Sequence, residues 1–211
     1  GIYYYVEYLH KEGGGGDFAA LWWQTPLSNT RALVPAQSLA PWVNCAPSVQ
    51  LRVGLQGPTS TGSSLMKDDL RAANLVPFTE PYAAAGFTLV GSGGESISPA
   101  LLAVTGPDAV VDWVMIEIRN KTNPATVVAT KSALLQRDGD VIGTDGRARI
   151  QFNIPADQYY IAIRHRNHFG AMTFAAKVLG SEVAYLDFSL AQEPMYGSNA
   201  RYAMPNGKMA L

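Results

Sequence analysis

Three aspartates stand close together within residues 138–145, in a pattern that suggests a metal ion. Asp138, Asp140 and Asp145 lie among glycines. Carboxylate oxygens are the ligands that Ca²⁺ prefers, so this segment is a candidate calcium site. A loop of the EF-hand type would need an acidic or amide residue where Ile142 stands, and no closing glutamate follows the loop. The alternative is two consecutive Asp-Gly turns that connect strands and hold no cofactor.

The densest polar segment is Arg-His-Arg-Asn-His at residues 164–168. In a continuous strand, Arg164, Arg166 and His168 share one face of the sheet. Because arginine binds carboxylates and other anions through two parallel hydrogen bonds, these residues predict an anion or acidic-glycan site. Two histidines are too few for a structural metal site. The alternative is a hydrogen-bonded strand end, in which an arginine pairs with one of three aspartates (Asp68, Asp69 or Asp112).

Aromatic residues crowd the N-terminal end of the chain. Tyr3 and Tyr5 belong to one predicted strand, and Trp22 and Trp23 belong to the next. Adjacent residues of a strand face opposite sides, so one of the two tryptophans faces each side. Such side chains either stack on a sugar ring or pack against a neighbouring domain. Trp113 lies in so apolar a strand that we expect it in the core.

Nothing in the sequence matches a catalytic motif. There is no Gly-x-Ser-x-Gly nucleophile elbow, and Cys45 has no catalytic context. The glycine-rich residues 91–95 lack the Lys-Ser/Thr pair of a phosphate-binding loop. We therefore expect a protein without enzymatic activity.

The elements that carry these residues follow a period of two, which is typical of strands. Apolar and polar residues alternate over 49–56, whereas residues 110–119 are apolar on both faces, as in the core of a sandwich. Further strands are predicted over residues 126–135, 147–154, 158–166, 172–178 and 183–190. Short strands with turn residues between them predict an all-β fold, an antiparallel β-sandwich with long Gly/Pro-rich loops. Residues 66–75 are the only stretch expected to form a short helix.

The sequence divides into three parts. Residues 1–42 hold a predicted N-terminal aromatic β-hairpin, with strands at 2–9 and 18–24 around a glycine turn, and then a proline-rich connector. Residues 48–190 form the predicted β-sandwich domain. Residues 191–211 are predicted to be an irregular C-terminal tail, because they contain glycine and asparagine and show no clear period.

The composition excludes several classes of protein. The 211 residues carry 16 Lys and Arg against 17 Asp and Glu, for a net charge of −1. This balance argues against a nucleic-acid binder, and the 47% of hydrophobic residues argue against disorder. No run of roughly 18 apolar residues exists, so no membrane span is predicted. Only 16% of the residues are charged, a low fraction that favours association with other copies or domains.

The N-terminal part resembles the last hairpin of a PA14-type β-sandwich domain. Residues 4–13, 16–17 and 21–24 carry this resemblance, with a tyrosine-rich strand, a glycine-containing turn and a strand that holds tryptophan. The resemblance covers residues 1–42. The part of the domain in which carbohydrate-binding members keep their calcium-coordinating aspartates is absent here. The resemblance therefore does not extend to sugar binding by that route.

The remainder resembles a module found near the C-terminal ends of very large secreted bacterial surface proteins. Residues 66–71, 77–82, 111–114, 134–140 and 160–168 carry this resemblance. It implies an exported, multidomain and non-catalytic protein that acts outside the cell or at its surface.

The resemblance, the low charge and the missing start signal together predict a structural or adhesive building block. We expect it to assemble with further copies, or with neighbouring domains of the same polypeptide, into a fibre or appendage. The alternative is a carbohydrate-binding module appended to a secreted enzyme, with a glycan as its partner. A calcium ion at the three aspartates is the one cofactor that the sequence suggests.

Overall fold

The computed structural model describes residues 20–24, 30–35, 46–59 and 63–211. The chain separates into two compact units, Gly1–Asn44 and Cys45–Leu211. In the first unit, β1 (Trp22–Trp23) pairs antiparallel with β2 (Ala32–Leu33). Strand β2 lies in the segment for which the prolines predict only a connector. The predicted partner strand at residues 2–9, with Tyr3 and Tyr5, lies outside the described residues.

The second unit is built on one nine-stranded sheet. Its central path is, in sheet order, β10 (Lys177–Leu179), β8 (Asp157–His165), β4 (Val110–Asn120), β5 (Val127–Gln136), β6 (Asp140–Ile142), β3 (Ser48–Arg52) and β11 (Val183–Asp187). In addition, β9 (His168–Met172) pairs with β8, and β7 (Ile150–Gln151) pairs with β3. Among the described strands, β3 and β11 run parallel and the other pairs run antiparallel. The prediction of an all-β, antiparallel, sandwich-like fold is confirmed.

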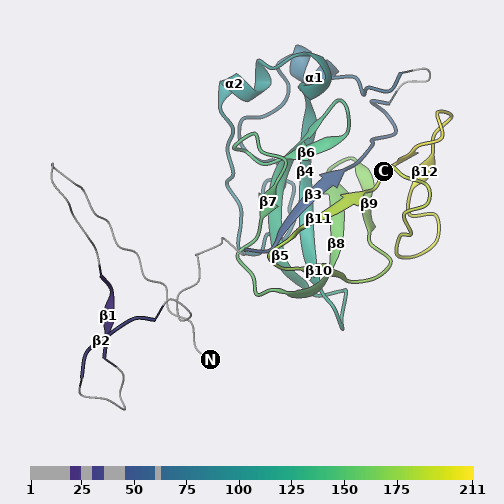
Figure 1. Ribbon diagram of the computed structural model, residues 1–211. Coiled ribbons are helices and arrows are strands. Elements are labelled where there is room, and N and C mark those ends of the chain that lie inside the picture. The colour runs from purple at the N-terminus through teal and green to yellow at the C-terminus, as the bar shows by residue number, and fades with distance from the viewer. Residues whose placement is uncertain (1–19, 25–29, 36–45, 60–62) are drawn as a thin grey trace. The chain divides into compact units, whose positions relative to one another are not determined.

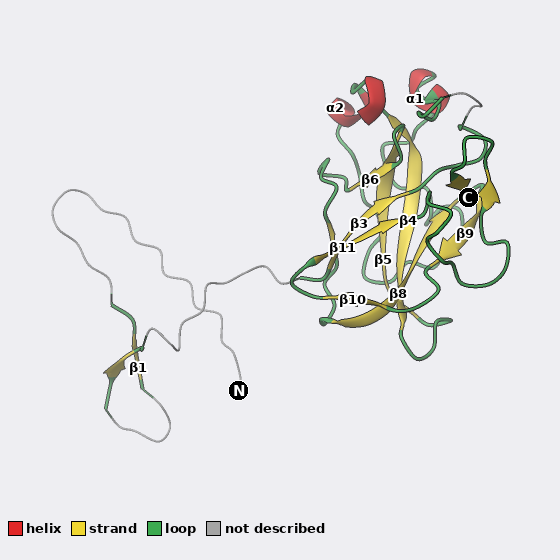
Figure 2. Cartoon of the chain, turned by 45° about the vertical axis from the view of Figure 1, so that its right-hand side comes forward, coloured by secondary structure: helices red, strands yellow, loops and turns green. Residues whose placement is uncertain are grey.

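The two ends of this sheet form separate layers of the second unit. Figures 1 and 2 show β3 and β11 crossing over β4, β5 and β8 in both views. The larger core cluster fills the space between the layers, where Leu51 of β3, Ile116 of β4 and Ile161 of β8 are fully buried. Burying a side chain of this size stabilises a fold by about 1.5–3 kcal/mol. The packing of these layers is therefore the main source of stability.

A second core cluster covers the other face of β4 and β5. Its side chains come from the sheet and from the long loop at residues 76–97 (Trp113, Met115, Leu134, Val76, Tyr82 and Ile97). Tyr82 donates its hydroxyl to the carbonyl oxygen of Trp113 at 2.9 Å, and the indole N–H of Trp113 donates to the carbonyl oxygen of Pro77 at 2.8 Å. Strand β4 is thus buried on both faces, as its continuous apolar sequence predicts.

Short helices lie at one end of the sheet (Figure 2). Helix α1 (Asp69–Ala72) falls within the predicted range of residues 66–75 but is shorter. Helix α2 (Pro99–Leu102) was not predicted; it begins at Pro99, and proline is favoured at the first position because its missing N–H would have no partner there. A 3-10 turn, η2 (Gly106–Asp108), leads into β4. No helix in the described part of the chain has the length and apolar character needed to cross a membrane.

The C-terminal residues are more regular than predicted. Strands β12 (Tyr202–Ala203) and β13 (Met209–Ala210) form an antiparallel hairpin. The backbone N–H of Leu211 donates to the carbonyl oxygen of Gly54 at 2.9 Å, and the Leu211 side chain belongs to the larger core cluster. The prediction of an irregular tail over 191–211 is therefore wrong for its second half. Backbone pairing with a segment so distant along the chain leaves no local pattern in the sequence.

Candidate functional site

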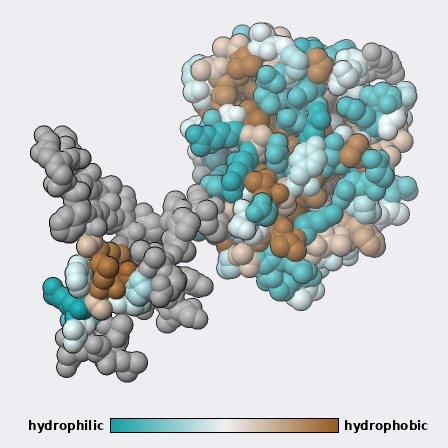
Figure 3. All heavy atoms as spheres, viewed as in Figure 1, coloured by the Kyte–Doolittle hydropathy of each residue, from teal (hydrophilic) through white to brown (hydrophobic). Residues whose placement is uncertain are grey.

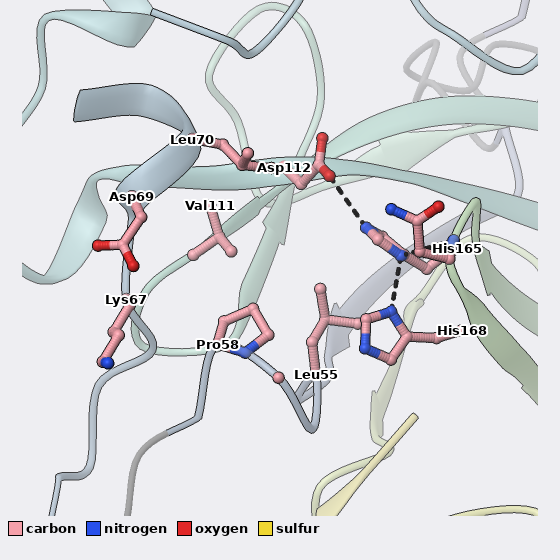
Figure 4. A pocket seen from close by; sticks show the side chains of 11 residues that line it. Leu55, Pro58, Lys67, Asp69, Leu70, Val111, Asp112, His165 and His168 are labelled. Atoms are coloured by element: carbon pink, nitrogen blue, oxygen red, sulfur yellow. Dashed lines mark hydrogen bonds and ion pairs between the residues drawn. The ribbon is translucent and has the colours of Figure 1, made fainter. Parts of the chain in front are cut away.

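A cavity of about 340 Å³ opens at the end of the second unit that carries α1. It lies between residues 55–58 and 67–70, the start of β4 and the hairpin formed by β8 and β9 (Figure 4). Its apolar wall consists of Leu55, Pro58, Leu70 and Val111. Its titratable side chains are Lys67, Asp69, Asp112, His165 and His168. Small-ligand sites measure about 300–1,000 Å³, so this cavity has room for one small molecule.

Asp112 is a buried carboxylate at the start of β4, only 1% exposed. The register of β4 against β5 shifts between Val110 and Asp112, as at a β-bulge, and a bulge changes the direction of the side chains that follow it. Arg166 Nη2 donates to both carboxylate oxygens, at 2.8 and 3.0 Å. The backbone N–H of Trp113 donates to Oδ1 at 2.8 Å, and Nε2 of His165 lies 3.1 Å from Oδ2.

These contacts decide the ionisation of Asp112. Burial raises the pKa of this carboxyl, but the hydrogen bonds from His165 and the Trp113 backbone, with the charge of Arg166, outweigh burial. The pKa of Asp112 therefore lies below its ordinary value. At neutral pH the group is an anion that accepts hydrogen bonds.

The hairpin of β8 and β9 brings two histidines together. Strand β8 ends at His165, Arg166 and Asn167 form the turn, and β9 begins at His168, which lies opposite His165 across the two strands. The two Nδ1 atoms are 2.8 Å apart. The prediction that a continuous strand places Arg164, Arg166 and His168 on one face is wrong. The chain reverses at Arg166, and His168 returns on the neighbouring strand.

Two contacts fix which nitrogen of His165 carries its hydrogen. The backbone N–H of Asn167 donates to His165 Nδ1 at 3.2 Å, so Nδ1 is an acceptor and carries no hydrogen. The hydrogen therefore lies on Nε2, which donates it to Asp112. The short contact between the two Nδ1 atoms then requires a hydrogen on Nδ1 of His168. Nε2 of a neutral His168 is left with a free lone pair.

His168 is half-buried and lines the cavity (Figure 4). Burial and the neighbouring His165 lower its pKa below the ordinary value of an imidazole, whereas Asp112 acts in the opposite direction. A lowered pKa keeps His168 neutral at pH 7. Asp112, His165 and His168, here named the Asp-His-His network, thus end in an imidazole nitrogen that accepts a hydrogen bond.

Lys67 and Asp69 stand across the cavity from His168 (Figure 4). Asp69 is the first residue of α1, and the backbone N–H of Lys67 donates to the carbonyl oxygen of Pro58 at 2.9 Å, which holds the two sides of the loop together. Both side chains are exposed, and neither forms a hydrogen bond or ion pair with another described residue. They remain available to a ligand.

Arg164 is held away from this arrangement. Its Nη1 lies 3.2 Å from Oε1 of Glu117, and its guanidinium carbon lies 5.0 Å from the centre of the Phe87 ring. Arg166 is held by Asp112, the arginine–aspartate pairing expected for a strand end. The structure therefore does not combine Arg164, Arg166 and His168 into the predicted anion site.

The three aspartates of the calcium hypothesis have other partners. Asp140 forms an ion pair with Arg52, with Nε and Oδ1 2.8 Å apart but without hydrogen-bond geometry. Asp138 Oδ1 accepts the backbone N–H of Asp140, and Asp145 Oδ1 accepts the backbone N–H of Arg147. Within the described ranges, no group of three or more His, Cys, Asp or Glu side chains is placed to hold a metal ion. The geometry is that of two Asp-Gly turns.

Trp22 and Trp23 of β1 are both exposed, Trp22 by 59% and Trp23 by 42%. They are adjacent in β1, opposite Leu33 and Ala32 of β2. Neighbours on a strand point to opposite sides, so Trp22 and Trp23 do not form one flat platform. Trp113 is fully buried, as predicted.

Sequence reasoning missed Asp112 and His165 as members of a site. The signal for Asp112 was an acidic residue inside an apolar strand, where a buried charge needs a partner. The signal for the histidines was their spacing, with two residues, Arg-Asn, between them. A two-residue hairpin turn there places both on one side of the sheet.

No family model, curated protein or solved structure matches the chain.

Proposed function

We propose that the chain is a non-catalytic structural and adhesive building block of a large secreted bacterial surface protein, in which it contacts further copies or neighbouring domains. The observation that carries this proposal is the exposure of large apolar side chains on the outer strands of the second unit. Phe169 of β9 is 93% exposed, Val178 of β10 is 70% exposed and Tyr185 of β11 is 56% exposed. The face in Figure 3 likewise shows hydrophobic patches between hydrophilic ones.

The ends of the sheet offer a way to cover these side chains. Strands β10 and β11 are the two ends of the sheet order. An edge strand presents backbone N–H and C=O groups that can pair with a strand of another chain. A neighbouring copy that adds a strand beside Val178 would satisfy the edge and bury that side chain. The resemblance to modules of secreted surface proteins and the low fraction of charged residues support the same conclusion.

The cavity supports binding rather than catalysis. The described residues that line it include no serine, threonine, cysteine or tyrosine beside the Asp-His-His network. Covalent catalysis through a hydroxyl or a thiol needs such a nucleophile within hydrogen-bond reach of a base. Asp112 and His165 are occupied by each other and by neighbouring groups.

Sedimentation over a range of concentrations, followed by negative-stain electron microscopy, tests assembly. We expect oligomers or filaments from the natural chain. Val178→Lys places a charge on the edge strand and should shift the species toward the monomer. Leu75→Lys is the matched control, because Leu75 is 64% exposed but lies outside the strands. A strict monomer at high micromolar concentration would contradict the proposal.

A second candidate function is a carbohydrate-binding module, and the cavity is the observation that favours it. An apolar wall beside a few polar groups suits a sugar ring, which has apolar C–H faces and polar hydroxyls. A glycan array, supplemented by pull-downs on insoluble polysaccharides, tests this function. Binding of the natural chain to a defined sugar supports it, and a blank result on both tests contradicts it.

A further inference from the structure

We infer that the cavity binds one sugar unit of hexose size, and that Nε2 of His168 accepts a hydrogen bond from one of its hydroxyls. The inference rests on the second candidate function and assigns it a site. It does not depend on assembly, because the cavity is formed within one copy of the second unit.

The hydrogen bonds around the two histidines run in one direction. The Asn167 backbone N–H and the Asp112 carboxylate fix the hydrogen of His165 on Nε2. His168 must therefore donate through Nδ1, and its Nε2 is an acceptor. An ionised carboxylate or phosphate oxygen carries no hydrogen, so it cannot form a hydrogen bond with that nitrogen. A hydroxyl brings the hydrogen that the nitrogen lacks.

The opposite side of the cavity carries both an acceptor and a donor. The Asp69 carboxylate accepts hydrogen bonds and the Lys67 ammonium donates them, and both are free of partners among the described residues. A ligand that spans the cavity therefore meets two acceptors and one donor. A sugar hydroxyl both donates and accepts, so a ring with hydroxyls on two sides satisfies His168, Asp69 and Lys67 together.

The cavity also has an apolar wall. Leu55, Pro58, Leu70 and Val111 line the space between the polar groups. A small anion would leave this wall in contact with water, whereas the C–H face of a sugar ring covers it. The volume of about 340 Å³ accommodates one sugar ring. Further units of a longer glycan would lie outside the cavity, beyond its open side.

Two substitutions of His168 distinguish the role of the acceptor Nε2 from that of the donor Nδ1. In His168→Asn, the side-chain amide can occupy the place of Nδ1 and donate to His165, but nothing replaces Nε2. In His168→Gln, the longer amide reaches the place of Nε2. Loss of one hydrogen bond to the ligand should weaken binding about tenfold in His168→Asn, and less in His168→Gln. Tyr159→Phe is the matched control, because it also removes one hydrogen bond, to the carbonyl oxygen of Pro155, and Tyr159 does not line the cavity.

The experiment uses the full chain on a glycan array, followed by titration of the selected sugar as its methyl glycoside into each variant. Thermal unfolding of every variant checks that the fold is intact. We expect His168→Asn and Asp69→Asn each to lose affinity while Tyr159→Phe keeps it. If a sugar binds and His168→Asn binds it equally well, the carbohydrate function holds and this site assignment fails. If the array is blank, both fail. Tighter binding of inorganic phosphate than of any glycoside would identify an anion site and overturn the inference.

Discussion

Asp112 and Glu117 are two buried carboxylates of the same strand, β4, with different surroundings. Each is at most 3% exposed, and each pairs with an arginine from the end of β8 or the turn after it, Arg166 for Asp112 and Arg164 for Glu117. Glu117 has a second arginine, Arg119, whose Nε donates to Oε2 at 2.8 Å. Asp112 has a histidine in the equivalent role.

The difference between them separates a structural ion pair from a candidate site. Glu117 lies between two arginines and does not line the cavity beside Asp112. At Asp112 the hydrogen bonds continue through His165 to His168, which lines the cavity. A buried ion pair is common in structural networks and does not by itself indicate function. What indicates a candidate site at Asp112 is the series of hydrogen bonds that ends at a free acceptor facing the cavity.

The largest expected effect comes from removing the arginine of each carboxylate. Arg166→Met leaves Asp112 without its cation, and breaking a buried ion pair on one side costs about 3–5 kcal/mol. Arg164→Met leaves Arg119 beside Glu117, so we expect a loss nearer about 1 kcal/mol. Urea unfolding measures both. Equal losses would show that the two carboxylates are neutralised in the same way and would remove the basis of the comparison.

The second-largest effect is expected from replacing His165, the middle residue of the Asp-His-His network. His165→Phe keeps a planar ring but removes a donor to Asp112 and the acceptor of the Asn167 and His168 hydrogens. We expect a loss of about 1–3 kcal/mol in the free energy of unfolding, together with weaker sugar binding. Tyr159→Phe is the control: it removes the hydrogen bond to the carbonyl oxygen of Pro155, outside the cavity, and should leave sugar binding unchanged. Unchanged stability and binding in His165→Phe would contradict the network.

The lowered pKa of His168 predicts a smaller, pH-dependent effect. Because its pKa is lower in the folded state than in the unfolded state, the unfolded chain binds more protons between the two values. The contribution of His168 to the free energy of unfolding is complete above its pKa in the unfolded chain, about 6.5. It is lost as the pH falls through its pKa in the folded protein. Unfolding temperatures measured across this interval should fall with pH, and less steeply in His168→Asn. Identical slopes for the two proteins would rule out this role of His168.

The smallest effect is expected at the three aspartates. Asp140 forms a partly exposed ion pair with Arg52, and such pairs contribute about 0.2–1 kcal/mol. Asp140→Asn should therefore cost less than about 1 kcal/mol. Because Asp138 and Asp145 accept backbone N–H groups, we expect the same unfolding temperature with CaCl₂ and with EDTA. A rise with calcium that disappears in Asp140→Asn would restore the calcium hypothesis.

Much of the fold could be predicted from the sequence, because its signals are local. The continuous apolar run at 110–119 predicts a strand buried on both faces, and β4 has that burial. The period of two predicts the antiparallel sheet. Strands β12 and β13 are two residues each, too short to show a period, and the contact of Leu211 with Gly54 depends on pairing across the fold. Neither could be predicted in this way.

The candidate site was harder to predict for the same reason. Its polar groups come from β4, from the segment before α1 and from the β8–β9 hairpin, which are far apart in sequence. The turn at Arg166 and Asn167 contains no glycine or proline, so Asn167 is the one turn-favouring residue there and the turn signal is weak. Without that turn His165 and His168 point to opposite faces, and with it they lie 2.8 Å apart at Nδ1.

The most direct test of the Asp-His-His network is nitrogen-15 NMR of the histidine side chains at neutral pH, with His168→Asn to assign the signals. We predict that His165 carries its hydrogen on Nε2, and that His168 carries its hydrogen on Nδ1 with an unprotonated Nε2. Addition of the methyl glycoside selected on the array should shift the His168 Nε2 signal most. A His168 that carries its hydrogen on Nε2, or a signal unaffected by the bound sugar, would contradict the account.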